Sequence, residues 1–562
     1  MDSAISYDIT NIAAPVTTTR GPRRRQVMVA LRALAALGVL VAINPVRAFG
    51  QSPQVGDVLE QYMRVLQVGG LIKAGSFFLR PLPNGTIPDS VGPWARNLGA
   101  APSHALGAAQ WALDPMRLRL TDNTTTPYGQ NDDAMWQGRG ANFALDAGAT
   151  ITWGHLTVTA HPTLVYAQNQ SFALAPVTVA GASKYEYPWA GLIDLPQRFG
   201  PGAYKRLDPG QSNVSLTLGG AKIGFGTENL WWGPGIQTSI LMSNEAPGFP
   251  HASLATSHPL DIGIGTVEGQ WIWGRLQQSA WYTGPDTASG RFFTGAEVAF
   301  SPAGSFFKGL TVGGGRVFYQ NIPTGGLSLS DYLTVIQPPF KQQLATASNP
   351  TGGDQRDEIL SFHWRWVLPA SGFETYGEWA RNDFAWNLTD FLLEPEHSQA
   401  YTLGLQKVQS LADGRILALN GELTHMERDG SFQIRDDGSY YIHGIVHRGY
   451  TQRGQMIGSA LGPGGDGQYL GADVYTDQGR WGLFVQRQVH NNDAFYQRYA
   501  VSHDSTLAHD VSLTFGGRTM VLARGLEVEF NAALTKELNR YMQLRNAVWN
   551  GHAGVTVVWR PR

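Results

Sequence analysis

The spacing of apolar residues predicts a helix that begins near residue 55. Between residues 55 and 66 apolar side chains recur every three or four positions, which places them on one face of an amphipathic helix. These side chains belong to Val55, Val58, Leu59, Tyr62 and Leu66. Gly69 and Gly70 follow, and glycine commonly ends a helix. We expect residues 49–110 to form a small helical segment. It is too short to bury a core of its own and therefore packs on the rest of the chain.

From about residue 112 the pattern changes to strict alternation, the period of a β-strand. In one example Phe362, Trp364 and Trp366 alternate with His363 and Arg365. In a soluble β-sandwich the polar face of such a strand would lie in water. In a membrane barrel the apolar face lies against lipid and the polar face lines the interior. The alternation by itself fits both architectures.

Three features favour the barrel. The first is a hairpin with unusually long arms, residues 140–153 and 156–170, around Gly154-His155. The second is a group of aromatic residues near strand ends, as in interfacial aromatic girdles: Trp271, Trp273, Trp281 and Tyr282. The chain also ends on an alternating strand that closes on Trp559. At roughly 25 residues for each strand and its loop, residues 111–562 give about 18 antiparallel strands. The predicted fold class is therefore an all-β transmembrane barrel with a small N-terminal periplasmic helical unit, and the Gly- and Pro-rich stretches 171–210, 320–355 and 427–470 are its loops.

The N-terminus predicts export. Arg23, Arg24 and Arg25 precede an apolar run over residues 33–43, and Ala48 follows as a small residue suited to a signal peptidase. The apolar run is too short to span the ~30 Å of a bilayer core. We interpret residues 1–48 as a signal peptide with an extended leader, which places residues 49–110 in the periplasm of a Gram-negative cell and residues 111–562 in its outer membrane.

Composition and charge exclude several classes of protein. Gly is abundant at 67 residues, aromatic residues make up 11% and charged residues only 15%, which excludes a disordered chain and a coiled coil. The formal net charge is -2 and no basic patch stands out after residue 50, so no nucleic-acid partner is expected. The sequence contains no cysteine, which excludes thiol catalysis and cysteine-based metal sites.

The most unusual segment is 228–235, which reads Glu-Asn-Leu-Trp-Trp-Gly-Pro-Gly. The faces of Trp231 and Trp232 suit the C–H patches of a sugar, and Glu228 and Asn229 suit its hydroxyl groups. The alternative interpretation is architectural: a strand end with interfacial tryptophans, followed by a Gly-Pro turn that folds inward and fills the lumen. The residues alone leave both interpretations open.

Segment 228–235, read together with segments 131–140 and 193–198, resembles the capsule assembly Wzi family. The resemblance extends to segments 55–72, 204–211 and 260–275. The resemblance covers essentially the whole mature chain. It implies an outer-membrane barrel with a periplasmic helical bundle and a role in attaching exported capsular polysaccharide to the cell surface, as a lectin. The implied partners are capsular polysaccharide and outer-membrane lipids, with a monomeric chain and no cofactor or metal. The candidate carbohydrate-binding residues are Glu228, Asn229, Trp231, Trp232, Asp132 and Trp136. A porin-type channel for sugars or other small solutes is the alternative function.

Signatures of catalysis are weak. Segment 502–505 reads Ser-His-Asp-Ser, with His509 and Asp510 close by, which suits a loop between strands better than a triad whose geometry adjacency cannot supply. Glu374 and Glu378 share one face of a strand, as paired carboxylates of a glycosidase would. Charged ladders are ordinary in barrel interiors, however, and we expect no enzyme activity.

Overall fold

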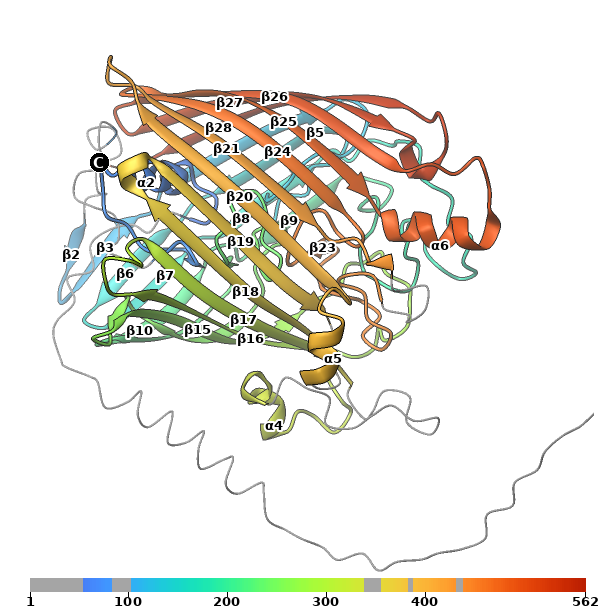
Figure 1. Cartoon of the computed structure of the whole chain (residues 1–562), viewed down its shortest axis with the longest axis horizontal. Helices are drawn as coiled ribbons and strands as arrows, with labels where there is room; N and C mark the ends of the chain where they lie inside the picture. Colours follow the sequence, from blue (N-terminus) through green and yellow to red (C-terminus); the bar gives the residue numbers. More distant parts are fainter. Residues whose placement is uncertain are drawn as a thin grey trace, which may run out of the picture. The chain divides into compact units, whose positions relative to one another are not determined.

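The computed structural model describes residues 54–82, 94, 103–337, 355–382, 388–430 and 438–561 (Figure 1). The chain divides into two compact units, Met1–Asn44 and Pro45–Arg562, and every described residue belongs to the second. The predicted signal segment 1–48 lies outside the described residues, so its processing stays a prediction.

Strands dominate the described chain. The helices are α2 (Val58–Val68), α4 (Leu329–Tyr332), α5 (Leu388–Leu393) and α6 (Asn492–Ser502), with short 3-10 turns η2 (Thr334–Ile336), η3 (Pro369–Ser371) and η5 (Arg540–Met542). The strands of the first half are β1 (Leu79–Arg80), β2 (His104–Leu106), β3 (Ala109–Leu113), β4 (Met116–Asn123), β5 (Gly140–Asp146), β6 (Ala149–Trp153), β7 (Leu156–Ala160), β8 (Thr163–Ala167), β9 (Tyr204–Asp208), β10 (Asn213–Leu218), β11 (Ala221–Gly226), β12 (Trp231–Trp232), β13 (His251–Thr256), β14 (Leu260–Asp261) and β15 (Gly265–Leu276). Those of the second half are β16 (Arg291–Pro302), β17 (Leu310–Asn321), β18 (Arg356–Leu368), β19 (Phe373–Asn382), β20 (Gln399–Ser410), β21 (Ile416–His425), β22 (Thr451–Gln452), β23 (Gln455–Met456), β24 (Asp466–Thr476), β25 (Gly479–His490), β26 (Asp510–Ala523), β27 (Leu526–Leu538) and β28 (Val548–Trp559).

Neighbouring antiparallel strands form one 24-stranded sheet that closes on itself. Strand β28 completes the ring because it pairs with both β27 and β4, with Trp559 opposite Met116. Strands β4, β6, β8, β10 and β14 each continue the preceding strand across a short interruption, and β2 pairs only with β3. Among the described residues the ring therefore has eighteen strands. The prediction of a barrel of about 18 antiparallel strands is confirmed.

The strands turn their polar faces inward. Along β18 the outward Phe362 and Trp364 are 52% and 36% exposed, whereas Ser361, His363 and Arg365 are buried. This is the reverse of a soluble sheet, in which the charged face would be wet. The same alternation of exposed apolar residues and inward polar ones continues along β27. The alternating pattern is thus the pattern of a barrel with an apolar outer surface, as a bilayer requires.

Side chains from long connections fill the interior. The main buried cluster joins Trp232 and Leu241, from the connection between β11 and β13, to Tyr441 and Tyr450, from the connection between β21 and β24. The Tyr441 hydroxyl donates to the carbonyl of Ile240 (2.7 Å), and the Tyr450 hydroxyl donates to that of Leu241 (2.6 Å). Wall residues such as Phe293 and Tyr319 complete the cluster, so two inward connections brace each other inside the ring.

Helix α2 forms where the helical spacing predicts it. The Asp57 side chain caps its start by accepting a hydrogen bond from the backbone N–H of Leu59 (3.1 Å), and Gly69 is its C-cap. The helix buries Tyr62 and Leu66 against a second cluster that includes the barrel-wall residue Val408. Figure 1 shows α2 at one end of the barrel and α6 at the other, and we call these the α2 end and the α6 end. Among the described residues no helix is both long and apolar enough to cross a bilayer.

Two expectations about element limits need correction. The helical segment expected over 49–110 does not reach its predicted end, because β2 and β3 already form strands from His104 onward. The long hairpin is present, but each arm is interrupted, between β5 and β6 and between β7 and β8. Gly148 sits at the first break, where an added Cβ would lie 2.3 Å from the carbonyl oxygen of Ala160. Pro162 sits at the second, where it supplies no N–H to the ladder.

Candidate functional site

Segment 228–235 lies inside the barrel, between β11 and β13. Its two tryptophans form β12, which pairs with β1, so that Trp231 lies opposite Arg80 and Trp232 opposite Leu79. Gly233 has a φ of +102°, which favours glycine, and Ser239 closes the following turn by donating its hydroxyl proton to the carbonyl of Trp232. Segment 228–235 therefore pairs with strand β1 from the N-terminal part of the chain, and the chain turns sharply directly after β12.

Two buried arginines attach this turn to the N-terminal part of the chain. Arg64 of α2 donates to the carbonyl of Pro234 (2.7 Å), and Arg80 donates to that of Gly235 (2.8 Å). Glu374 of the wall balances the first guanidinium at 2.8 Å, and Glu60 of α2 balances the second at 3.0 Å. Buried charges persist only when paired and hydrogen-bonded, and here both conditions hold.

The two indoles are buried and face different neighbours. Trp231 is 2% exposed, and the Arg80 guanidinium stacks 4.2 Å from its ring centroid. Trp232 is fully buried and donates its indole N–H to the side-chain oxygen of Gln270 (2.8 Å). Gly295 of the wall makes room for this ring, since an added Cβ there would lie 3.0 Å from it. In this arrangement neither ring face is presented to a polymer outside the barrel.

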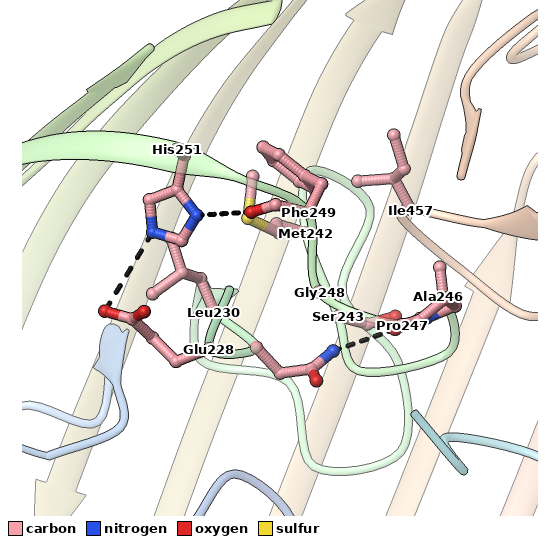
Figure 2. A pocket seen from close by; sticks show the side chains of 11 residues that line it. Glu228, Leu230, Met242, Ser243, Ala246, Pro247, Gly248, Phe249, His251 and Ile457 are labelled. Carbon is pink, nitrogen blue, oxygen red and sulfur yellow. Dashed lines mark hydrogen bonds and ion pairs between the residues drawn. The ribbon is translucent and has the colours of Figure 1, made fainter. Parts of the chain in front are cut away.

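Glu228 and Asn229 line a very small cavity (Figure 2). Asn229 is held on both sides: its amide donates to the carbonyl of Ala246 (2.8 Å), and its side-chain oxygen accepts from Gln211 (2.8 Å). A Glu228 carboxylate oxygen lies 4.0 Å from the Nε2 of the buried His251. The cavity between them measures about 10 Å³, which is the room that one water molecule needs, and a sugar ring does not fit.

The other two candidates lie on the connection between β4 and β5. This connection docks on the continuation of segment 228–235, because the Asn131 N–H donates to the Glu245 carboxylate and the Asp133 N–H donates to the carbonyl of Asn244 (2.7 Å). Asp132, between them, is half-buried. Trp136 stacks on Phe199 with ring centroids 4.6 Å apart. The structure thus joins the two sequence segments through Asn244 and Glu245, while Trp136 and the Trp231–Trp232 pair keep separate partners.

Burial also shifts acid–base behaviour at this junction. It raises the pKa of the Glu245 carboxyl to about 8, and the neighbouring Asp132 carboxylate raises it further. It raises the pKa of Asp132 to about 6, against the opposing effect of Arg119. Both carboxyls belong to inward connections rather than to wall strands. The junction therefore holds protons more firmly than free carboxyls would.

The groups considered for catalysis have structural partners. Glu374 holds Arg64 and Arg365, while Glu378 accepts the Ser361 hydroxyl (3.0 Å) and the N–H of Ile240 (3.1 Å). Segment 502–505 is the end of α6 and the turn after it, as a loop interpretation predicts. These contacts give each group a role in the wall or in a turn.

Sequence analysis did not single out the aromatic residues of α6. This helix lies at the α6 end and exposes Tyr496 and Tyr499, each to 42%. Their spacing of three residues, beside Phe495, was the available signal. It lacks the accompanying apolar stripe that made α2 evident, because α6 has polar residues on every side.

Comparisons with known proteins agree with this architecture. A family model described as capsule assembly protein Wzi matches residues 116–530. The structure resembles Wzi of Escherichia coli, an outer membrane protein involved in group 1 capsule assembly and a carbohydrate-binding β-barrel. The TM-score is 0.56 at 13% identity, over 90% of this chain and 99% of that one. OccAB2 of Acinetobacter baumannii gives a TM-score of 0.38 at 8% identity, over 79% of this chain and 97% of that one. OccK2 of Pseudomonas aeruginosa gives 0.39 at 9% identity, over 80% and 97%.

No curated protein sequence matches the chain. The similarity to the Escherichia coli barrel shows the fold. The family match spans most of the chain, from the start of β4 into β27, and so includes most of the ring strands, segment 228–235 and both inward connections. The resemblance noted from the sequence is confirmed, and the chain belongs to the Wzi family of capsule assembly proteins.

Proposed function

We propose that this chain is an outer-membrane β-barrel that attaches exported capsular polysaccharide to the surface of a Gram-negative cell. The α2 end faces the periplasm and the α6 end faces the exterior. Turns at the α2 end are short, such as residues 154–155 and 524–525, whereas connections at the α6 end are long, such as 168–203 and 426–465. Short periplasmic turns and long external loops are typical of outer-membrane barrels.

The observation that carries the proposal is the filled interior. A channel for sugars needs an open polar path, but Trp232, Leu241, Tyr441 and Tyr450 form one buried apolar cluster across the inward connections. A polymer is also wider than such an interior. The proposed binding surface is therefore the outside of the α6 end. The Escherichia coli relative is a carbohydrate-binding barrel of capsule assembly, which supports carbohydrate as the ligand.

In this proposal segment 228–235 is the inner frame for the external connections. Its continuation holds Tyr441 and Tyr450, and Ser243 donates from its backbone to Ile457 (2.9 Å) and from its hydroxyl to Gly458 (2.6 Å). Direct sugar contact by Glu228, Asn229, Trp231, Trp232, Asp132 or Trp136 stays a prediction. Binding assays on folded single variants test it.

Binding without catalysis is the proposed activity. The chain acts as a monomer, embedded in outer-membrane lipids, with capsular polysaccharide as partner and without cofactor, metal or nucleic acid. Attachment needs only contacts between loops and polymer, and the groups considered for catalysis already serve the wall.

Deletion of the gene tests the function. Total polymer should stay constant while capsule moves from the cell-bound fraction to the medium, and a plasmid-borne copy should restore attachment. A strain that cannot synthesise the polymer gives the blank value of the polymer assay. Unchanged attachment, together with lost growth on a small sugar, would instead support the porin-type channel.

A further inference from the structure

A hollow lies on the outer surface of the barrel wall, over strands β16 to β20. Its volume is about 750 Å³, within the roughly 300–1,000 Å³ that ligand pockets usually have. The side chains around it point away from the lumen, since Val298 is 51% exposed, Phe362 52% and Leu403 46%. The hollow therefore belongs to the apolar surface that faces the bilayer, and we call it the wall groove.

Two glycines form the floor of the wall groove. Gly314 lies between Val298 of β16 and Phe362 of β18, so the wall has no side chain between these two. Gly377 lies beneath the ring of Trp364, where an added Cβ would be 2.9 Å from the indole nitrogen. The groove thus arises because glycines occupy outward positions where the neighbouring strands carry large side chains.

Contacts among its own side chains hold the aromatic side of the wall groove in place. The rings of Phe362 and Trp379 stack with centroids 6.2 Å apart and an interplanar angle of 17°. Trp379 donates its indole N–H to the side-chain oxygen of Gln399 (3.0 Å) and meets the ring of Phe391 in α5 edge to face at 5.8 Å. Because these rings are already fixed, a ligand that packs against them pays little entropy to order them.

The wall groove rises toward the α6 end as it crosses the strands. Val298 and Gly314 lie in the middle part of β16 and β17. Trp379 and Tyr401 lie within three residues of the α6 ends of β19 and β20. A chain-like ligand that follows the groove therefore enters it near the outer rim and ends near the middle of the membrane, as an acyl chain of the outer leaflet does.

Two short helices lie near the α6 ends of these strands. Trp273 of the wall donates its indole N–H to the carbonyl of Tyr332 in α4 (2.8 Å), and Figure 1 shows α4 outside the ring of strands. Both helices expose leucines, with Leu329 of α4 at 67% and Leu393 of α5 at 74%. Exposed apolar side chains on short helices suit the boundary between lipid headgroups and acyl chains. The two helices thus fit the level of the outer-leaflet headgroups beside the groove.

We infer that the wall groove binds one acyl chain of lipid A, the lipid of the outer leaflet. The chain lies over Gly314 and Gly377, against the stacked rings of Phe362 and Trp379, and the lipid headgroup lies near α5. The hydrocarbon region offers no water to fill an apolar hollow, so lipid fills it, and the fixed rings favour one retained chain. The inference goes beyond capsule attachment and rests only on the proposed orientation, with the α6 end outside.

Lipid retention tests the site. The full-length protein is extracted from outer membranes and washed in detergent micelles, and the lipid A that remains on each chain is measured by mass spectrometry. The parent should keep lipid A through the wash. Leu403→Trp fills the groove and should lower the retained lipid A severalfold, because the acyl chain loses its contacts with the wall. Val312→Trp, at another lining position, is a second filling variant with the same expected result.

Leu534→Trp is the matched control for the filling variants. It makes the same substitution at an outward position of β27 that is 51% exposed and lies outside the groove. It should leave the retained lipid A unchanged. Heat-modifiable gel mobility identifies any variant that fails to fold.

Photo-crosslinking in intact cells tests which lipid supplies the chain. Benzoylphenylalanine in place of Tyr401, a lining residue of similar shape near the outer rim, should form adducts with lipid A. The same group in place of Leu526, which is 40% exposed at the α2 end of β27, should form adducts with phospholipid of the inner leaflet.

Lipid A retention that both filling variants leave unchanged would overturn the site, as would an equal loss in Leu534→Trp. Phospholipid adducts in place of lipid A adducts at position 401 would overturn the assignment to the outer leaflet. Adducts at that position with the chain itself, or with a second copy, would give the groove to a protein occupant and overturn the site as well. These outcomes leave capsule attachment untouched, because gene deletion tests it separately.

Discussion

At the scale of single residues, the sequence is compatible with two roles for Trp231, sugar contact and packing inside the barrel. In the structure its surroundings fit the packing role. Its ring lies under Arg80, and its strand position is set by pairing with β1. Replacing a buried tryptophan with alanine typically costs about 3–5 kcal/mol of unfolding free energy, because contacts are lost and a cavity remains. Trp231→Ala should therefore lower the temperature at which the folded gel band converts to the unfolded one.

The matched control is Trp153→Ala, because Trp153 is 63% exposed at the end of β6. It should shift the conversion temperature far less. Undiminished heat resistance in Trp231→Ala, combined with weaker glycan binding, would favour direct sugar contact over the framing role and would move the binding surface inward.

Glu245 gives the fold a dependence on pH. Burial raises the pKa of its carboxyl from 4.5 to about 8. The folded state therefore keeps a proton that the unfolded chain releases, and the free energy of unfolding falls as the pH rises from 4.5 through 8. The stabilisation is complete below pH 4.5. Glu245→Gln stays neutral and can still accept the Asn131 N–H, so its conversion temperature should change less between pH 5 and pH 8.

Asp413→Asn is the control for this pH series, since Asp413 lies on an exposed turn and pairs with Arg415. Its conversion temperature should follow that of the parent across the range. A parent protein equally heat-resistant at pH 5 and pH 8 would show that Glu245 does not retain its proton in the folded state.

At the scale of elements, we expect α2 and β1 to close the α2 end. Arg64 and Arg80 join them to the turn at Pro234 and Gly235, so removal of residues 54–82 would unpair β12 and expose buried polar groups at that end. The full chain should give a small conductance in planar bilayers, and deletion of this segment behind an intact signal should raise it. A large steady conductance in the full chain would contradict the closed end and revive the channel.

Arg64→Met is the finer version of that test, because it removes one attachment and leaves Glu374 paired with Arg365 at 2.6 Å. We expect intermediate conductance with intermittent openings. Arg415→Met at an exposed turn of the same end is the control and should leave the conductance unchanged.

The strands could be predicted from the sequence because each strand has one face toward an apolar environment and one toward a polar environment. The polarity of each side chain therefore indicates which face it lies on. Helix α2 could also be predicted, because its apolar period lies within one short stretch of sequence. The pairing of β1 with β12 could not be predicted, since Arg80 and Trp231 lie far apart in the chain and neither two-residue strand has a period. The interruption at Gly148 likewise depends on a carbonyl from the neighbouring arm.

At the scale of the whole molecule, the sequence identified the candidate segments but not whether their side chains point into the barrel or out of it. Trp231 and Trp232 stood out by composition, and composition cannot tell an inward ring from an outward one. Tyr187, Arg498 and Tyr541 come from three distant connections, and only closure of the barrel brings them together. Contacts between separate loops leave no spacing for sequence analysis to detect.

Closure itself is the last feature open to test. Strand β28 seals the ring by pairing with β27 and β4, so a chain that ends at residue 547 would leave two unpaired edges. In a bilayer each unpaired backbone group costs several kcal/mol. This truncated chain should fail to give the fast-migrating folded band on unheated gels. Removal of residues 561–562 alone, which lie beyond β28, should keep that band. A folded band from the chain ending at 547 would mean that the ring can close without its final strand.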